Sequence, residues 1–141
     1  ISMKEEVTKE VQNVKEEQMI FKDKKILVVD DNKMNIKVAL KILSDYNLEI
    51  DTCMSGMECI EMVKTNTYDL ILLDDMMPQM SGTETLENLK RLDNFNAKVV
   101  VLTANAITGM KEKYLNLGFD DYLAKPIDKK DFDKIIKRYL K

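Results

Sequence analysis

The sequence contains no histidine, only two cysteines and only four glycines. Without histidine the chain cannot form a Ser-His-Asp triad, an imidazole metal site or a phosphohistidine, so any histidine chemistry must come from a partner. Cys53 and Cys59 lack the further ligands of a zinc site and lie in an apolar context, which predicts two small buried hydrophobes. The glycines form no phosphate-cradling loop, which disfavours nucleotide binding.

Long apolar runs and an excess of one charge are also missing. No run approaches the roughly 20 residues that would span a bilayer, and the N-terminus is charged where a secretory signal would be apolar. We therefore expect a cytoplasmic chain with no membrane insertion. The net charge is −3 with acidic and basic residues interspersed. This pattern offers no broad basic face and disfavours direct binding of nucleic acid.

The length of 141 residues and the apolar content of 45% suit one well-buried domain with an appendage. Residues 1–24 are rich in Lys and Glu, and Val7, Val11 and Val14 fall on one helix face. We predict a helical linker or extension there. Two heptads are too few to separate a solvated helix from a dimerising one. Residues 25–141 are predicted to form the folded domain.

Within that domain, short apolar runs alternate with segments of helical periodicity, which is typical of an α/β fold with a mostly parallel sheet. The first, third and fourth runs are continuously apolar, as expected for strands covered by helices on both faces. The second run alternates polar and apolar residues and suits an edge strand. The predicted strands are Ile26–Asp30, Leu48–Cys53, Leu70–Asp74, Lys98–Thr103 and Asp121–Ala124.

Apolar stripes between the strands predict helices that face the sheet. The stripes are Ile36, Leu40 and Leu43; Met57, Ile60 and Val63; Leu86 and Leu89; Met110, Tyr114 and Leu117; and Phe132, Ile135, Ile136, Tyr139 and Leu140. Ser55 and Ser81, each followed by Glu three residues later, predict helix N-caps. Gly118 is expected to end the fourth helix, and Asp128 to precede the fifth. We expect any effector domain to lie outside this chain.

Four of the predicted strands stop in residues that can carry chemistry. Asp30 and Asp31 follow the first strand's apolar run, Asp74 the third's, Thr103 the fourth's and Lys125 the fifth's. The carboxyl ends of parallel strands meet at the edge where such sheets bind ligands, so we expect these side chains to converge. Each one alone could be an ordinary polar residue at a loop. Their joint occurrence is harder to explain in that way.

Three carboxylates brought together repel one another and need a cation. An all-oxygen ligand set with room for water and phosphate oxygens suits Mg²⁺ better than Zn²⁺. Lys125 adds a compact positive charge and Thr103 a hydroxyl donor, both of which can hold phosphoryl oxygens. The available nucleophile is then a carboxylate, which can form an aspartyl phosphate. Asp74 closes the apolar run and is favoured over Asp75, which is interpreted as loop surface.

The motifs ILVVDDN, YDLILLDDMMPQMSG, VVVLTAN and DDYLAKP occur in the order and at the separations found in response-regulator receiver domains. Residues 25–141 resemble this family. The resemblance implies a doubly wound, flavodoxin-like sheet of five parallel strands in the order 2-1-3-4-5, with five flanking helices. The family pattern Asp-x-x-Met-Pro matches Asp74 to Pro78 and identifies Asp74 as the phosphoacceptor.

Further roles are implied by the resemblance alone. Asp31 would bind Mg²⁺ directly, Asp30 largely through water, and Met76 through its backbone carbonyl, beside Asp74. Thr103, Ala104 and Lys125 would contact the phosphoryl group, and Tyr122 would be the aromatic ring that turns inward when Thr103 moves. The peptide bond between Lys125 and Pro126 is expected to be cis.

The function implied is phosphoryl transfer from a partner phosphohistidine to Asp74. The donor would be a histidine kinase or a histidine phosphotransfer protein, and a downstream protein would read the switched face. The parent is expected to be a hybrid sensor histidine kinase, with a stand-alone regulator as the alternative. A degenerate receiver that binds partners without phosphorylation is disfavoured by the intact acids. A turnover phosphatase would need a second acid two residues beyond its nucleophile, where Met76 and Asn32 stand.

Overall fold

The computed structural model describes residues 23–104 and 109–140, so the predicted helix over residues 1–24 lies almost wholly outside the described residues. The described chain forms one sheet of five strands in the order β2-β1-β3-β4-β5. All four pairings are parallel, which confirms the expected topology. The strands are β1 (Lys25–Val29), β2 (Glu49–Cys53), β3 (Leu70–Asp74), β4 (Lys98–Thr103) and β5 (Asp121–Ala124).

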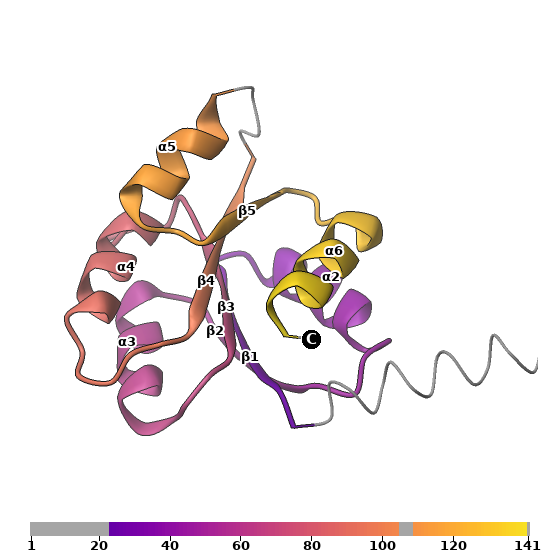
Figure 1. The fold of residues 1–141 in the computed structure, drawn as a ribbon, viewed down its shortest axis with the longest axis horizontal. Coiled ribbons are helices and arrows are strands. Elements are labelled where there is room, and N and C mark those ends of the chain that lie inside the picture. Colours follow the sequence, from indigo (N-terminus) through magenta and orange to yellow (C-terminus); the bar gives the residue numbers. More distant parts are fainter. Residues whose placement is uncertain (1–22, 105–108, 141) are drawn as a thin grey trace, which may run out of the picture.

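Helices cover both faces of the sheet (Figure 1). They are α2 (Lys33–Leu43), α3 (Gly56–Thr65), α4 (Gly82–Lys90), α5 (Met110–Leu117) and α6 (Lys129–Tyr139). Helices α2 and α6 pack on one face, and α3, α4 and α5 on the other. This is the doubly wound arrangement that the sequence predicts.

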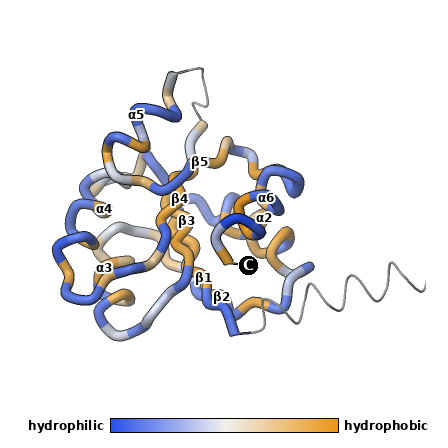
Figure 2. The backbone as a smooth tube through the Cα atoms, viewed as in Figure 1, coloured by the Kyte–Doolittle hydropathy of each residue, from blue (hydrophilic) through white to orange (hydrophobic). Residues whose placement is uncertain are grey.

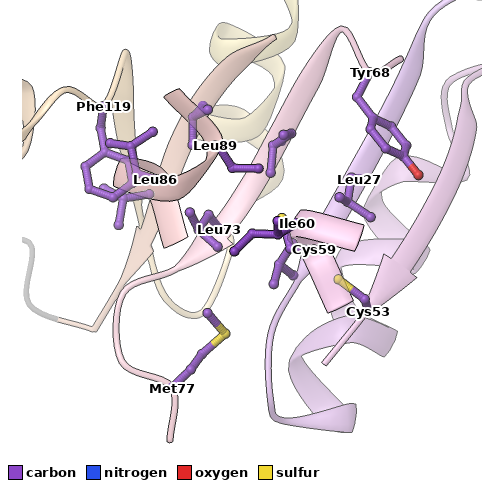
Figure 3. Close-up of a cluster of buried hydrophobic side chains, with 14 of the residues drawn as sticks. Leu27, Cys53, Cys59, Ile60, Tyr68, Leu73, Met77, Leu86, Leu89 and Phe119 are labelled. Carbon is purple, nitrogen blue, oxygen red and sulfur yellow. The ribbon is translucent and has the colours of Figure 1, made fainter. Parts of the chain in front are cut away.

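The central strands carry continuous apolar runs because each contributes side chains to two cores, one on each face of the sheet. In β1, Ile26 and Val28 join the core under α2 and α6, whereas Leu27 and Val29 join the core under α3, α4 and α5. Alternation of side chains along a strand explains this division. The apolar centre of the sheet stands out in Figure 2, and Figure 3 shows the second core closely. The edge strand β2 exposes Glu49, as its mixed pattern predicts.

Three residues assigned to the buried stripes are exposed instead. Leu40 is 36% exposed, Met57 55% and Leu117 40%, so these predictions are wrong. In α2 the buried face runs through Ile36, Ala39 and Leu43, which places Leu40 at its margin. In α3 the buried positions are Gly56, Cys59 and Ile60, which turns Met57 outward. A Cβ on Gly56 would lie 2.2 Å from Oγ1 of Thr85, so this glycine allows α3 and α4 to approach each other closely.

The predicted helix boundaries are confirmed by their capping contacts. The Oγ atoms of Ser55 and Ser81 accept hydrogen bonds from the backbone N–H groups of Glu58 and Glu84, both at 3.1 Å. Asp128 caps α6 by accepting from the backbone N–H of Lys130 at 3.0 Å. Such caps satisfy N–H groups that a helix start otherwise leaves unpaired.

Two further expectations concern the cysteines and the membrane. Cys53 and Cys59 are buried free thiols in the second core, as predicted (Figure 3). Among the residues that the structure describes, no helix has the length and apolar character needed to cross a bilayer.

Candidate functional site

The carboxyl edge of the sheet gathers the polar residues that follow the strands. Asp30, Asp74 and Thr103 are at most 2% exposed. Such burial is unusual for the two carboxylates. Asp31, in contrast, is exposed. One carboxylate oxygen from each of Asp30, Asp31 and Asp74 lies within 4.8 Å of the other two. The structure therefore brings together the three acids that the sequence places at the strand ends.

Lys125 closes this acidic group from the end of β5. Its Nζ donates to Oδ1 of Asp74 at 2.6 Å and lies 3.7 Å from Oδ2 of Asp30. The backbone N–H of Lys125 donates to the carbonyl of Thr103 at 2.8 Å, which continues the pairing of β4 and β5. The Lys125–Pro126 peptide bond is cis, which confirms that expectation. The lysine ammonium thus lies directly against the predicted phosphoacceptor.

Burial and neighbouring charge shift the acid-base properties of this pair. Burial raises the pKa of Asp74 to about 6 from its ordinary value of 3.8; the Lys125 ammonium opposes this rise, and the Asp30 carboxylate adds to it. Burial alone would lower the pKa of Lys125, but its hydrogen bond to Asp74 and the three nearby carboxylates raise it. Near pH 7 the site therefore holds a carboxylate of raised basicity beside a charged ammonium.

The donor set fits a hard divalent cation. Oδ1 of Asp30 accepts from the backbone N–H of Asn32 at 2.9 Å, which fixes this carboxylate. Its Oδ2 is buried and has no hydrogen-bond partner in the described part of the chain. Mg²⁺ prefers carboxylate oxygens and usually keeps several waters when it is bound by a protein. The acids are therefore close enough to hold one such ion, some directly and others through water.

Thr103 belongs to a second polar contact, on the side of the sheet that α5 covers. Its Oγ1 lies 3.0 Å from the hydroxyl of Tyr114, and that hydroxyl donates to Oδ2 of Asp75 at 2.6 Å. The interpretation of Asp75 as loop surface is therefore wrong. Strand alternation could have indicated this, because it turns Asp75 away from Asp74 and toward the α5 side.

The other predicted site residues lie around the pocket with differing exposure. Met76 is 81% exposed, and Ala104 is exposed as well. Tyr122 is half-buried, and its ring centroid lies 5.9 Å from Nζ of Lys111 on α5. Its register partner is Val101, two residues before Thr103, so Tyr122 and Thr103 share the α5 side of the sheet.

A cavity of about 280 Å³ opens between α5 and the end of β3, where Asp74 lies. Its lining includes Asp74, Met76, Thr103, Ala104, Tyr114 and Lys125. The cavity therefore joins the predicted phosphoacceptor to the predicted phosphate-contacting groups and to the Tyr114 hydroxyl. A small anionic group on Asp74 would face donors from β4 and β5.

Gly82 is a residue of this site that the sequence reasoning missed. Its backbone N–H donates to the carbonyl of Asp75 at 2.9 Å. A Cβ at this position would lie 2.4 Å from the backbone oxygen of Asp74, closer than a contact can be. A glycine immediately after the capping Ser81 was the available signal, and its close approach closes the loop beside Asp74.

A protein-family model described as the response regulator receiver domain matches residues 26–137. The chain is 37% identical over 115 residues to the signal transduction histidine-protein kinase BarA of Escherichia coli. The alignment covers 81% of the chain but 12% of that kinase. The chain thus spans a small part of the length of this relative.

Solved structures with the same fold include two receiver domains. One is the receiver of the sensor histidine kinase PA1611 from Pseudomonas aeruginosa, described with magnesium in its active-site cleft. Its TM-score is 0.75 at 29% identity, with 83% of this chain and 97% of that chain covered. The other comes from a Saccharomyces cerevisiae response regulator in complex with a histidine phosphotransfer protein. Its TM-score is 0.75 at 26% identity, with 85% of this chain and 90% of that chain covered.

Proposed function

The chain belongs to the response regulator receiver domain family of two-component phosphorelay systems, and on this premise we propose that it is an active receiver whose phosphoacceptor is Asp74. The observation that carries the proposal is the pairing of a buried carboxylate with a lysine ammonium at 2.6 Å, next to two further acids. A receiver that had lost phosphorylation would have no need to keep three mutually repelling carboxylates together.

In the proposed reaction a carboxylate oxygen of Asp74 attacks the phosphorus of a partner phosphohistidine. A P–O bond forms, the P–N bond breaks, and the electron pair leaves with the imidazole, which takes up a proton. Asp74, with its pKa near 6, is mostly ionised at pH 7 and available as a nucleophile. Lys125 transfers its contact from the free carboxylate to an oxygen of the incoming phosphoryl group.

Mg²⁺ is proposed as the cofactor and, when bound, would neutralise charge on the phosphoryl oxygens. We assign its ligands to Asp31, Asp74 and the backbone carbonyl of Met76, with Asp30 acting largely through water. The fixed orientation of Asp30 supports this assignment, as does its buried Oδ2, which accepts no hydrogen bond from the described residues. The magnesium in the active-site cleft of the related receiver from Pseudomonas aeruginosa supports the choice of Mg²⁺ as the cation.

The phosphorylated state is proposed to be read through the α5 side of the sheet. Thr103, Ala104 and Lys125 would hold the phosphoryl oxygens, and Tyr122 would turn its ring inward after Thr103 moves. Thr103 and Tyr122 share the same face of neighbouring strands, which supports such coupling. Phosphorylation adds nearly two negative charges and would shift an equilibrium between two arrangements of this region.

The donor is proposed to be a histidine kinase or a histidine phosphotransfer protein, and a downstream protein the reader. The yeast receiver bound to a histidine phosphotransfer protein supports the choice of donor. The similarity to BarA supports a hybrid histidine kinase as the parent. Such a phosphorelay would place this domain in the cytoplasm.

The acceptor is tested by incubating the purified chain with acetyl phosphate and Mg²⁺ and measuring phosphorylation by intact-protein mass spectrometry. We expect one phosphoryl group on the wild type, none on Asp74→Asn, and continued labelling of Asp75→Asn. The last variant removes the same charge from the adjacent residue and is the matched control. Labelling of Asp74→Asn would refute the assignment, and an unlabelled wild type would favour the degenerate receiver.

A further inference from the structure

We propose that Tyr114 and Asp75 together restrain Thr103 in the resting state and thereby set how readily the domain accepts a phosphoryl group. The inference rests on the proposed function of Asp74 and Thr103. It assigns Tyr114 as a positioning residue, since its hydroxyl acts on the site through Thr103. It also gives Asp75 a role distinct from that of the adjacent phosphoacceptor.

The direction of the hydrogen bonds follows from the number of available hydrogens. A tyrosine hydroxyl has one hydrogen, and an ionised carboxylate can only accept. Tyr114 therefore gives its hydrogen to Asp75, at 2.6 Å. The 3.0 Å contact between Thr103 and Tyr114 then needs the hydrogen of Thr103. Asp75 thus fixes the direction of a chain that runs from Thr103 through Tyr114 to the carboxylate.

This direction matters because a phosphoryl oxygen is also an acceptor. Thr103 has a single hydroxyl hydrogen, and it cannot donate to a phosphoryl group on Asp74 while it donates to Tyr114. Phosphorylation must therefore break the contact between Thr103 and Tyr114 before the Thr103 hydroxyl can serve the phosphoryl group. The hydrogen bond from Thr103 to Tyr114 therefore stabilises the resting state relative to the phosphorylated state.

Both ends of the restraint are held by the fold. Tyr114 is 3% exposed, and its ring packs edge-on against Phe119 with centroids 6.0 Å apart. The backbone N–H of Asp75 donates to the carbonyl of Leu102 at 2.9 Å, and its own carbonyl accepts from Gly82. The hydroxyl and the carboxylate are therefore positioned before Thr103 joins them.

The same two hydrogen bonds connect the phosphoryl site to α5. Tyr114 is the fully buried residue of that helix, and its hydroxyl ties α5 to the loop after β3 through Asp75. Withdrawal of Thr103 removes one of the two contacts of this hydroxyl. The restraint thus gives α5 a direct response to phosphorylation, in addition to any movement of Tyr122.

The test uses beryllium fluoride, a stable mimic of the phosphoryl group, with saturating Mg²⁺. Its affinity is measured by calorimetry for the wild type, Tyr114→Phe, Thr103→Val and the double variant. We expect Tyr114→Phe to bind the mimic about threefold to tenfold more tightly, because the resting state loses one hydrogen bond. In the Thr103→Val background the same substitution should change the affinity by less than about twofold.

Tyr68→Phe is the matched control. Tyr68 is also 3% exposed, and its hydroxyl donates to Asp51 at 2.7 Å, outside the phosphoryl site. This variant should bind the mimic like the wild type. An unchanged or weaker affinity of Tyr114→Phe, or an equal gain in the Thr103→Val background, would overturn the restraint. A wild type that binds no mimic would instead refute the proposed function, and the restraint with it.

Discussion

Replacing Asp74 by asparagine should change how the stability of the metal-free protein depends on pH. The Asp74 carboxyl is 2% exposed, and burial raises its pKa to about 6. The folded protein therefore binds a proton at this site more tightly than the unfolded chain does. The resulting contribution to stability is complete below pH 3.8 and is lost as the pH rises through about 6.

The size of the effect follows from the two pKa values. Each pKa unit corresponds to about 1.4 kcal/mol, so a rise from 3.8 to about 6 corresponds to on the order of 3 kcal/mol. The asparagine side chain of the variant does not titrate. Between about pH 4 and pH 7, the wild type should therefore lose up to about 3 kcal/mol of unfolding free energy relative to Asp74→Asn.

Urea unfolding in the presence of EDTA, repeated across this pH range, measures the difference. Asp93→Asn removes the same charge from an exposed position between α4 and β4, and so separates the effect of the buried pocket from that of net charge. A difference between the wild type and Asp74→Asn that stays constant from pH 4 to pH 7 would refute the reasoning. So would a wild type that gains stability relative to the variant as the pH rises.

Two further predictions concern the metal and the loop beside the acceptor. Protons should compete with Mg²⁺ for Asp74. At pH values below about 6, the Mg²⁺ affinity measured by calorimetry should therefore decrease by up to tenfold per pH unit. An affinity independent of pH would exclude Asp74 as a ligand. Gly82→Ala should cost about 1 to 3 kcal/mol of unfolding free energy in urea, because its Cβ would meet the Asp74 backbone oxygen at 2.4 Å. Glu87→Ala, on the exposed side of the same helix, is the control, and equal stability of both variants would contradict the close approach.

The elements that the sequence predicts best are those whose position follows from burial on both faces. The runs ILVV before Asp30 and LILL before Asp74 are apolar throughout. The strands that contain them begin and end within one residue of prediction. The convergence of Asp30, Asp74 and Lys125 followed from the same geometry, because parallel strands bring their carboxyl ends to one edge.

What the sequence could not predict depends on how closely helices approach the sheet. Periodicity assigns a residue to a helix face but does not separate the centre of that face from its margin, and Leu40 was misplaced for this reason. The contact of Asp75 with Tyr114 joins residues 39 positions apart and depends on the packing of α5. The close approach of Gly82 to Asp74 depends on the path of a loop that no periodicity describes.

The charges of the pocket give a physical reason why the proposed phosphoryl transfer should depend on the proposed metal. Three ionised carboxylates lie near one ammonium, so the metal-free site has a net charge of about minus two and repels an anionic donor. A divalent cation would bring this sum close to zero, and Lys125 could then turn toward the phosphoryl group without leaving Asp74 uncompensated. Asp75 would add to the repulsion, but its carboxylate is directed to Tyr114 on the α5 side. Two adjacent acids can therefore serve separate purposes, because alternation along the chain turns Asp74 toward the proposed cation site and Asp75 toward Tyr114.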